Sequence, residues 1–225
     1  MSKNYKLAVL DIAGTTVVDK DFVAIAFVEA FMQYGIDLQI EEINPLMGFK
    51  KTEAISTVLQ RKKIEVTPEK VDFINNIFTN QMIYFYSTSS QVEALPHAEA
   101  FFQYLKSKGI AVALDSGFPR VIVDAIVDRL GWLERGLIDF VVASDEVEKG
   151  RPFPFMINRL MGMAGVEDSA LVIKVGDTMV DIQEGRMSAC GLVAAVTTGA
   201  YSRAELMAYS PDHIVDSLAE LEQYI

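Results

Sequence analysis

A short apolar run that ends in an aspartate lies near the start of this 225-residue chain. The run covers residues 7–10, which suits one strand, and Asp11 follows it directly. Strands buried on both faces of a parallel sheet read as continuous apolar runs. Open α/β sheets bind ligands in the crevice outside the carboxyl ends of their strands. Asp11 is therefore a candidate active-site carboxylate, with an ordinary turn residue as the alternative.

The remainder of the chain shows two different patterns. Between residues 17 and 85 apolar residues recur at helical spacing, without a strand signal. Further along, short apolar runs alternate with helical patterns, which is typical of a parallel, doubly wound sheet with right-handed crossovers. The expected later strands are 110–114, 140–143, 171–175, 192–196 and a short 214–215. The expected helices are 22 to about 35, one from 40, 52–62, one from 68, 98–108, 116–130, 154–161 and 180–187.

The helical block after the first strand is too long for a single crossover connection. We therefore predict an α/β fold with a doubly wound, Rossmann-like core and an inserted all-helical cap domain. The predicted core comprises residues 1–16 and 87–225, and the predicted cap comprises residues 17–86.

Composition limits the classes of partner. The net charge is −11, from 31 acidic and 20 basic residues, which argues against nucleic acid and against an anionic membrane surface. The single cysteine, Cys190, cannot form a disulfide within the chain and suits a reducing compartment. Residues 1–6 lead straight into the first strand without a signal-peptide pattern, and no apolar run reaches the length of a membrane span. These features predict a cytoplasmic protein.

Polar clusters follow four of the predicted strands, where the fold would gather them at one edge of the sheet. The clusters are 11–15, 116–117, 149–151 and 176–181. Carboxylates in the first and last clusters would form a hard oxygen site of the kind that Mg²⁺ prefers. A serine followed by glycine offers a hydroxyl and backbone N–H groups to a phosphoryl oxygen, and Arg151 adds charge-assisted hydrogen bonds. Each cluster alone is weak evidence, because Asp is common in turns and Arg on surfaces.

Taken together, these motifs resemble the haloacid dehalogenase superfamily of phosphotransferases. The resemblance rests on Asp11 to Thr15, Ser116-Gly117, Gly150-Arg151-Pro152 and Gly176 to Asp181, and it covers essentially the whole chain. It implies a catalytic aspartate that attacks phosphorus beside a bound Mg²⁺.

Two departures from the usual superfamily pattern point to one group within the superfamily. Ordinary members carry a second Asp, a general acid/base, where this chain has Ala13, and they carry a Lys where it has Arg151. Both exchanges are similar to the phosphonatase group, as are the stretches 149–156 and 173–178. A phosphonate has a carbon leaving group, so the acid that protonates a leaving alkoxide is not required there. In phosphonatases a cap lysine instead forms a Schiff base with the substrate aldehyde, and Lys51 aligns with it.

The resemblance implies a role for each candidate residue. Asp11 is the nucleophile and a metal ligand. Further metal ligands are the Ala13 carbonyl, Asp177 and Asp181, the last directly or through water. Ser116, Gly117 and Arg151 hold the phosphoryl oxygens, and Lys51 acts from the cap, covalently or as a substrate-binding cation.

Three positions depart from the phosphonatase pattern. Ala54 replaces a His, Phe118 replaces a Tyr, and an acidic residue, about Asp21, replaces a Cys. The only two histidines, His97 and His213, match no family site.

These observations predict a Mg²⁺-dependent hydrolase of a small phosphonate, which acts through an aspartyl-phosphate and a Schiff base at Lys51. The first alternative is a phosphate monoester phosphatase resembling phosphoglycolate phosphatases. A non-enzymatic phospho-acceptor module is less favoured, because it has no need of a cap, and metal-free carbon–halide hydrolysis fits poorly with Asp177 and Asp181. The expected partner is a small phosphorylated or phosphonate substrate. The oligomeric state is left open, with a homodimer as one candidate.

Overall fold

The computed structural model describes residues 4–225 and contains a six-stranded parallel sheet; residues 1–3 of the N-terminal stretch lie outside it. The strand order is β3-β2-β1-β4-β5-β6. The order reverses between β1 and β4, which places the ligand-binding crevice of this kind of sheet beside Asp11. The predicted α/β class is confirmed. The strands are β1 (Leu7–Asp11), β2 (Ala111–Ser116), β3 (Phe140–Ala143), β4 (Val172–Gly176), β5 (Leu192–Val196) and β6 (His213–Val215).

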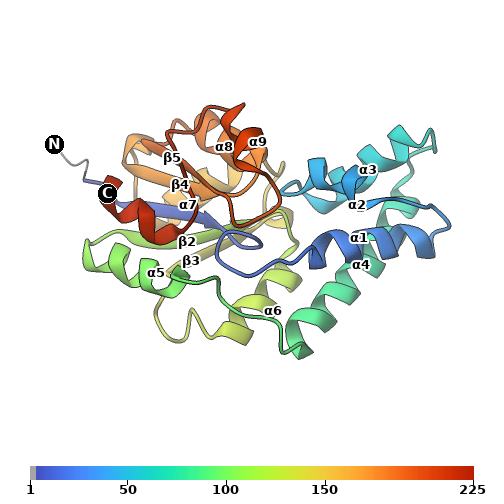
Figure 1. The fold of residues 1–225 in the computed structure, drawn as a ribbon, viewed down its shortest axis with the longest axis horizontal. Coiled ribbons are helices and arrows are strands. Elements are labelled where there is room, and N and C mark those ends of the chain that lie inside the picture. Colours follow the sequence, from blue (N-terminus) through green and yellow to red (C-terminus); the bar gives the residue numbers. More distant parts are fainter. Residues whose placement is uncertain (1–3) are drawn as a thin grey trace.

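The chain between β1 and β2 is helical, as the sequence predicts. Figure 1 shows the first four of these helices together at one end of the molecule, beyond the tip of β1. The first three are α1 (Phe22–Gln33), the short α2 (Ile40–Ile43) and α3 (Lys51–Arg61). The fourth, α4 (Pro68–Thr88), begins with Pro68 at its first position and ends two residues beyond the predicted cap. A 3-10 turn, Asn44–Leu46, follows α2 and contains Pro45.

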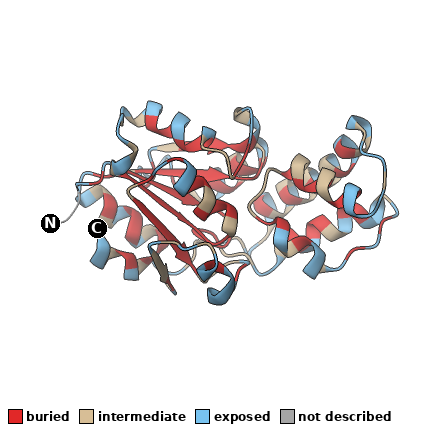
Figure 2. Ribbon diagram, turned by 90° about the horizontal axis from the view of Figure 1, so that it is seen from above, coloured by how far each residue is buried: buried red, intermediate tan, exposed pale blue. Residues whose placement is uncertain are grey.

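Alternate residues of the central strand enter two hydrophobic clusters on opposite faces of the sheet. Ala8 and Leu10 pack with α5 (Ala98–Ser107) and α6 (Arg120–Leu130), while Leu7 and Val9 pack with α7 (Phe155–Ala164) and α8 (Met179–Met187). Figure 2 shows the strands buried along their length and the helices buried mainly on their inner sides. The central strands are therefore covered on both faces, which explains their continuous apolar sequences.

Several element boundaries differ from the prediction. Ser116 ends β2 instead of opening a helix, because Pro119 breaks the segment and α6 begins only at Arg120. α7 continues to Ala164, three residues beyond its predicted end, and stops before Gly165 in the left-handed conformation. The sequence did not predict the short α9 (Arg203–Met207) or the 3-10 helix Leu218–Tyr224. Short elements such as these carry too few periodic positions to stand out in a sequence.

Two expectations from composition can be compared with the structure. Cys190 is buried, and burial raises the pKa of its thiol to about 12, so it is an inert packing residue. Within residues 4–225, no helix combines the length and the apolar character needed to cross a bilayer.

Candidate active site

A cavity lies between the carboxyl ends of the strands and the inserted helices. It brings together six of the eight predicted site residues, from both the core and the cap. Its lining comprises Asp11, Ala13, Asp19, Val23, Met47, Gly48, Lys51, Ser116, Gly117, Phe118, Asp177, Thr178 and Ala200. The other two predicted residues, Arg151 and Asp181, are buried next to Asp11 and do not line the cavity.

The loop that precedes Lys51 is seated tightly on the core. A Cβ atom at Gly117 would lie 2.4 Å from the carbonyl oxygen of Phe49, and one at Gly48 would lie 2.5 Å from Oγ1 of Thr178. Gly48 also has a φ of +83°, which side-chain-bearing residues rarely adopt. Glycine at these two positions therefore allows the cap loop to approach the core closely. Lys51, the first residue of α3, is thereby placed in the cavity.

Asp11 ends β1 and is buried beside a cation. Nη1 of Arg151 donates to its Oδ1 at 2.6 Å. Burial raises the pKa of Asp11 to about 6; Arg151 opposes that rise, and the neighbouring Asp181 adds to it. The arrangement concentrates negative charge around the predicted nucleophile, and an additional cation would relieve it.

Arg151 lies in a fully buried position where carboxylates surround it. Nε donates to Oε2 of Glu184 at 3.1 Å, and Nη2 donates to the carbonyl oxygen of Asp115 at 2.9 Å and to the Asp115 carboxylate. Nη1 also lies 3.1 Å from Oδ1 of Asp181. Hydrogen bonds on several sides therefore hold the planar guanidinium in place, and its Nη1 faces Asp11.

Lys174, in the centre of β4, completes this buried network. Its Nζ lies 2.6 and 2.7 Å from the two carboxylate oxygens of Asp115, 2.9 Å from Oε2 of Glu184 and 3.2 Å from Oδ1 of Asp181. Burial raises the pKa of Asp115, but Arg151 and Lys174 together outweigh burial and keep that pKa below its usual range.

Sequence reasoning missed Asp115, Lys174 and Glu184. A signal for the first two was present, because each is a charged residue inside an otherwise apolar strand run. A charge in a central parallel strand must have a buried partner, and the two strands that flank β1, β2 and β4, offer opposite charges. Glu184 gave no comparable signal, since acidic residues are common in helices.

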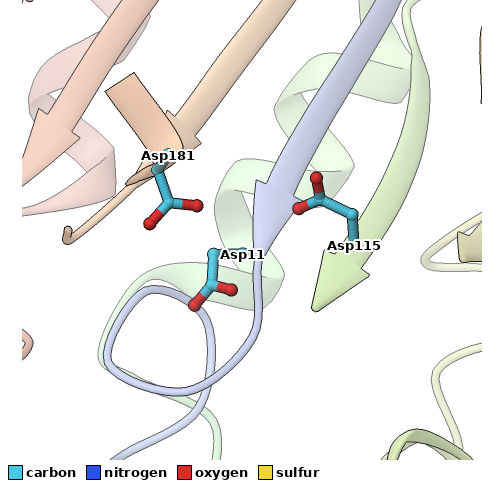
Figure 3. A group of neighbouring side chains, drawn as sticks. All are labelled: Asp11, Asp115 and Asp181. Atoms are coloured by element: carbon cyan, nitrogen blue, oxygen red, sulfur yellow. The ribbon is translucent and has the colours of Figure 1, made fainter. Parts of the chain in front are cut away.

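Figure 3 shows the carboxylates of Asp11, Asp115 and Asp181 around the tip of β1, from β1, β2 and α8. Their oxygens lie within 4.8 Å of one another. Both oxygens of Asp115, however, already accept hydrogen bonds from Lys174. Asp115 is therefore satisfied as part of an ion network, which leaves its oxygens poorly placed for a metal.

Asp177 lines the same cavity as Asp11. Its Oδ1 accepts from Oγ1 of Thr15 at 3.0 Å, and its Oδ2 accepts from the backbone N–H of Ala200 at 2.8 Å. Burial raises the pKa of Asp177 well above its usual range, and Asp11 and Asp181 add to the rise. Among the described residues, five buried carboxylates around Asp11 thus face three buried cations, Arg151, Lys174 and the cap residue Lys51.

The donor set fits a hard divalent cation. Oδ1 of Asp181 is buried without a hydrogen-bond donor, although both cations of the network lie nearby. Asp181 Oδ2, in contrast, accepts from the backbone N–H and Oγ1 of Thr178 at 3.2 and 2.5 Å, which fixes the side chain. Excess carboxylate oxygens with one unpaired acceptor match the preference of Mg²⁺ for oxygen ligands.

Lys51 is an ammonium-bearing side chain in apolar surroundings. Only 4% of the residue is exposed, and its Nζ lies 5.1 Å from the ring centroid of Phe118 and 5.9 Å from that of Phe78. Burial lowers the pKa of Lys51 to about 8, although Asp11 opposes the shift. A substantial fraction of the amine is therefore neutral, and nucleophilic, near physiological pH.

Comparison with known proteins decides the family. The profile of haloacid dehalogenase-like hydrolases matches residues 8–195. The chain belongs to this hydrolase family. The Asp11 motif and the Gly176 to Asp181 motif both fall within the matched range.

Individual relatives of this hydrolase are similar over most of its length. A phosphonoacetaldehyde hydrolase from Pseudomonas putida is 32% identical over 204 residues, covering 85% of this chain and 73% of the relative. One from Bacteroides fragilis is 25% identical, covering 98% of this chain and 88% of the relative. The hydrolase also resembles the solved structure of a phosphonoacetaldehyde hydrolase-like protein from Oleispira antarctica, with a TM-score of 0.86 at 22% identity over 99% of this chain and 91% of that one.

A further solved structure shares the fold of this hydrolase. It is a putative phosphoglycolate phosphatase from Lactobacillus delbrueckii subsp. bulgaricus, with a TM-score of 0.78 at 23% identity over 97% of each chain. The predicted resemblance to the phosphonatase-like haloacid dehalogenases is therefore confirmed, and the chain is an enzyme of the hydrolase class.

Proposed function

We propose that this hydrolase is Mg²⁺-dependent and cleaves the carbon–phosphorus bond of a small aldehyde phosphonate. The observation that carries the proposal is the shared cavity of Lys51 and Asp11, in which a buried amine of lowered pKa faces the same space as a strand-end carboxylate. The proposal includes the division into a core, residues 1–16 and 87–225, and a cap, residues 17–86, because Lys51 acts from the inserted helices.

The first step takes place at Lys51. Its neutral amine adds to the substrate aldehyde and water leaves, which produces an iminium. The positive nitrogen then attracts electrons from the neighbouring carbon. The aromatic rings of Phe78 and Phe118 shield this nitrogen from water, which favours the neutral amine and protects the imine from hydrolysis.

The second step takes place at Asp11. An oxygen of its carboxylate attacks phosphorus, the carbon–phosphorus bond breaks, and the bonding pair moves into the enamine at Lys51. Water then hydrolyses the aspartyl-phosphate, while protonation of the enamine carbon and hydrolysis of the resulting iminium free Lys51. Because the leaving group is carbon, no acid at position 13 is needed, in agreement with Ala13.

The remaining residues bind and orient the phosphoryl group. Ser116 and Gly117 line the cavity beside Asp11, and Arg151 keeps one edge of its guanidinium on Asp11. The Mg²⁺ would be held by Asp11, the Ala13 carbonyl, Asp177 and Asp181, the last directly or through water. When bound, it supplies charge neutralisation at the phosphoryl oxygens.

Reductive trapping tests the proposal directly. With Mg²⁺, an aldehyde phosphonate and borohydride, we expect irreversible labelling of Lys51, located by peptide mass spectrometry, together with release of inorganic phosphate when borohydride is omitted. Lys51→Arg keeps the positive charge but cannot form an imine, so it should abolish both signals. Lys50→Arg, which alters the adjacent lysine outside the cavity lining, is the matched control. An active Lys51→Arg variant without adduct would contradict carbon–phosphorus cleavage through Lys51.

A phosphate monoester phosphatase is the second candidate. Ala54, buried in α3, and Phe118 replace the His and Tyr of the phosphonatase pattern, and the His is the group expected to shuttle protons in imine formation. The fold shared with the named phosphoglycolate phosphatase supports the same alternative. Phosphate release from monoesters, without release from aldehyde phosphonates, would favour this second function.

A further inference from the structure

One carboxylate in the cavity has no role in the function proposed above. Asp19 belongs to the segment between β1 and α1, and it lines the cavity together with Lys51 and Asp11. The backbone N–H of Val23 donates to its Oδ1 at 3.3 Å, and the N–H of Phe22 also interacts with the carboxylate. A carboxylate has about four lone-pair sites, so these two contacts anchor Asp19 and leave acceptor capacity toward the cavity.

Asp19 and Lys51 influence each other across the cavity without touching. The carboxylate stabilises the ammonium form of Lys51, and the ammonium stabilises the ionised form of Asp19. No ion pair within 4.0 Å joins these two side chains in the described structure. A proton that passes between them would therefore travel through a bridging water molecule or the substrate carbonyl oxygen.

Imine formation at Lys51 needs a group that accepts and returns protons. The other carboxylates of the cavity are already engaged, since Asp11 accepts from Arg151 and Asp177 accepts from Thr15 and Ala200. No histidine lines the cavity in the part of the chain that the structure describes. Asp19 is the remaining carboxylate within reach of the Lys51 amine.

We propose that Asp19 is the general base and general acid of the imine step at Lys51. The inference rests on the proposed function, because it presupposes that Lys51 reacts with an aldehyde. Burial raises the pKa of Asp19 above its usual range, which suits a group that must hold and release a proton.

Each of the three protons of the Lys51 ammonium has a defined destination in the imine step. Asp19 takes one proton from the Lys51 ammonium through the bridging water, and the resulting amine forms a nitrogen–carbon bond with the aldehyde. The π electrons of the carbonyl move to its oxygen, which receives a second proton from the nitrogen and becomes the carbinolamine hydroxyl. Asp19 then returns its proton to that hydroxyl. The carbon–oxygen bond breaks, water leaves, and the nitrogen lone pair forms the iminium, which retains the third proton.

A pair of Asn substitutions in one loop tests this role. Asp19→Asn keeps an oxygen that can accept from Val23 but cannot exchange protons, while Asp21→Asn alters an exposed carboxylate that does not line the cavity. Asp21 has a φ of 60°, a conformation that Asn tolerates well. The readout is the rate of borohydride-trapped adduct at Lys51 with an aldehyde phosphonate, followed by mass spectrometry.

We expect Asp19→Asn to slow trapping by about 10²-fold or more, the usual contribution of a positioned acid/base, and Asp21→Asn to leave the rate within about twofold of the wild type. Inorganic phosphate should bind Asp19→Asn with unchanged affinity, which would show that the phosphoryl site is intact. Trapping at the wild-type rate in Asp19→Asn would overturn the inference and leave the proposed function standing. Absence of an adduct in the wild type would overturn both.

Discussion

Nη1 of Arg151 lies 2.6 Å from Oδ1 of Asp11, a hydrogen bond between residues 140 positions apart in the chain. The same guanidinium reaches Asp115 on the neighbouring strand and Glu184 on α8. The orientation of Arg151 toward Asp11 is therefore set by a buried ion network beneath the cavity.

Arg151→Lys should destabilise the protein although the charge is kept. A lysine has three donors on a single nitrogen and cannot replace the four hydrogen bonds that the guanidinium makes to Asp11, Asp115 and Glu184, and each lost hydrogen bond to a charged group costs about 1.5–3 kcal/mol. We expect a lower urea midpoint and a strong loss of turnover. Arg159→Lys is the control, because Arg159 is half-exposed and lies 3.4 Å from Glu146. An unchanged midpoint in Arg151→Lys would show that the network does not depend on the guanidinium.

Asp115 and Lys174 should behave as a coupled buried pair. Lys174→Met alone leaves a buried carboxylate without its partner and should cost about 3–5 kcal/mol in the free energy of unfolding. Combining it with Asp115→Asn should cost less than the sum of the single changes, with a coupling energy of about 0.5–3 kcal/mol. Urea denaturation of the four proteins measures the coupling.

The exposed pair Lys106 and Asp139 is the control for this cycle. Its atoms also approach to 2.6 Å, but both side chains are about one-third exposed. Lys106→Met should cost below about 1 kcal/mol, because solvent screens such pairs. Equal costs at the two sites would mean that burial adds nothing to the Asp115 and Lys174 interaction.

Mg²⁺ should stabilise the folded protein by mass action. At 100 times the dissociation constant, binding contributes about 2.7 kcal/mol. For a chain of this length that corresponds to a rise in melting temperature of about 5–10 °C. Asp177→Asn should largely remove the shift, because Asp177 faces the cavity beside Asp11. A melting curve that responds neither to millimolar Mg²⁺ nor to a chelator would count against the metal site.

Asp11→Asn should lose turnover with every substrate, since an amide does not attack phosphorus. The folded protein should remain, because the amide oxygen still accepts from Arg151 and a buried charge has been removed. We expect the melting temperature in chelator to be no lower than that of the wild type. Activity above background, measured as phosphate release, would argue against an aspartyl-phosphate.

Labelling of Lys51 should depend on pH through its amine. Burial lowers the pKa of Lys51 to about 8, and only the unprotonated amine attacks an aldehyde. Below pH 8 the neutral fraction, and with it the rate of imine formation, should rise about tenfold per pH unit, and it should level off above pH 8. Trapping with cyanoborohydride between pH 6 and pH 9 measures this profile. A rate that still rises at pH 9 would indicate an amine of ordinary pKa.

The amino-acid sequence was sufficient for the fold class and for most of the cavity. Continuous apolar runs such as 7–10 and 192–196 belong to strands buried on both faces, which are typical of a covered parallel sheet. The carboxyl ends of parallel strands lie at one edge of the sheet, so the sequence alone predicts that Asp11, Ser116 and Asp177 lie close together, and all three line the cavity.

Tertiary structure alone decided the ion network and the environment of the cap residues. Asp115, Lys174 and Glu184 come from three elements, and only the register of β1, β2 and β4 and the seating of α8 bring their side chains around Arg151. Likewise, the sequence places Lys51 at a helix start and leaves open whether it acts covalently or as a substrate-binding cation, and the rings of Phe78 and Phe118 make it a buried amine. Burial, charge pairing and pKa depend on distances between residues remote in the chain, which local patterns do not encode.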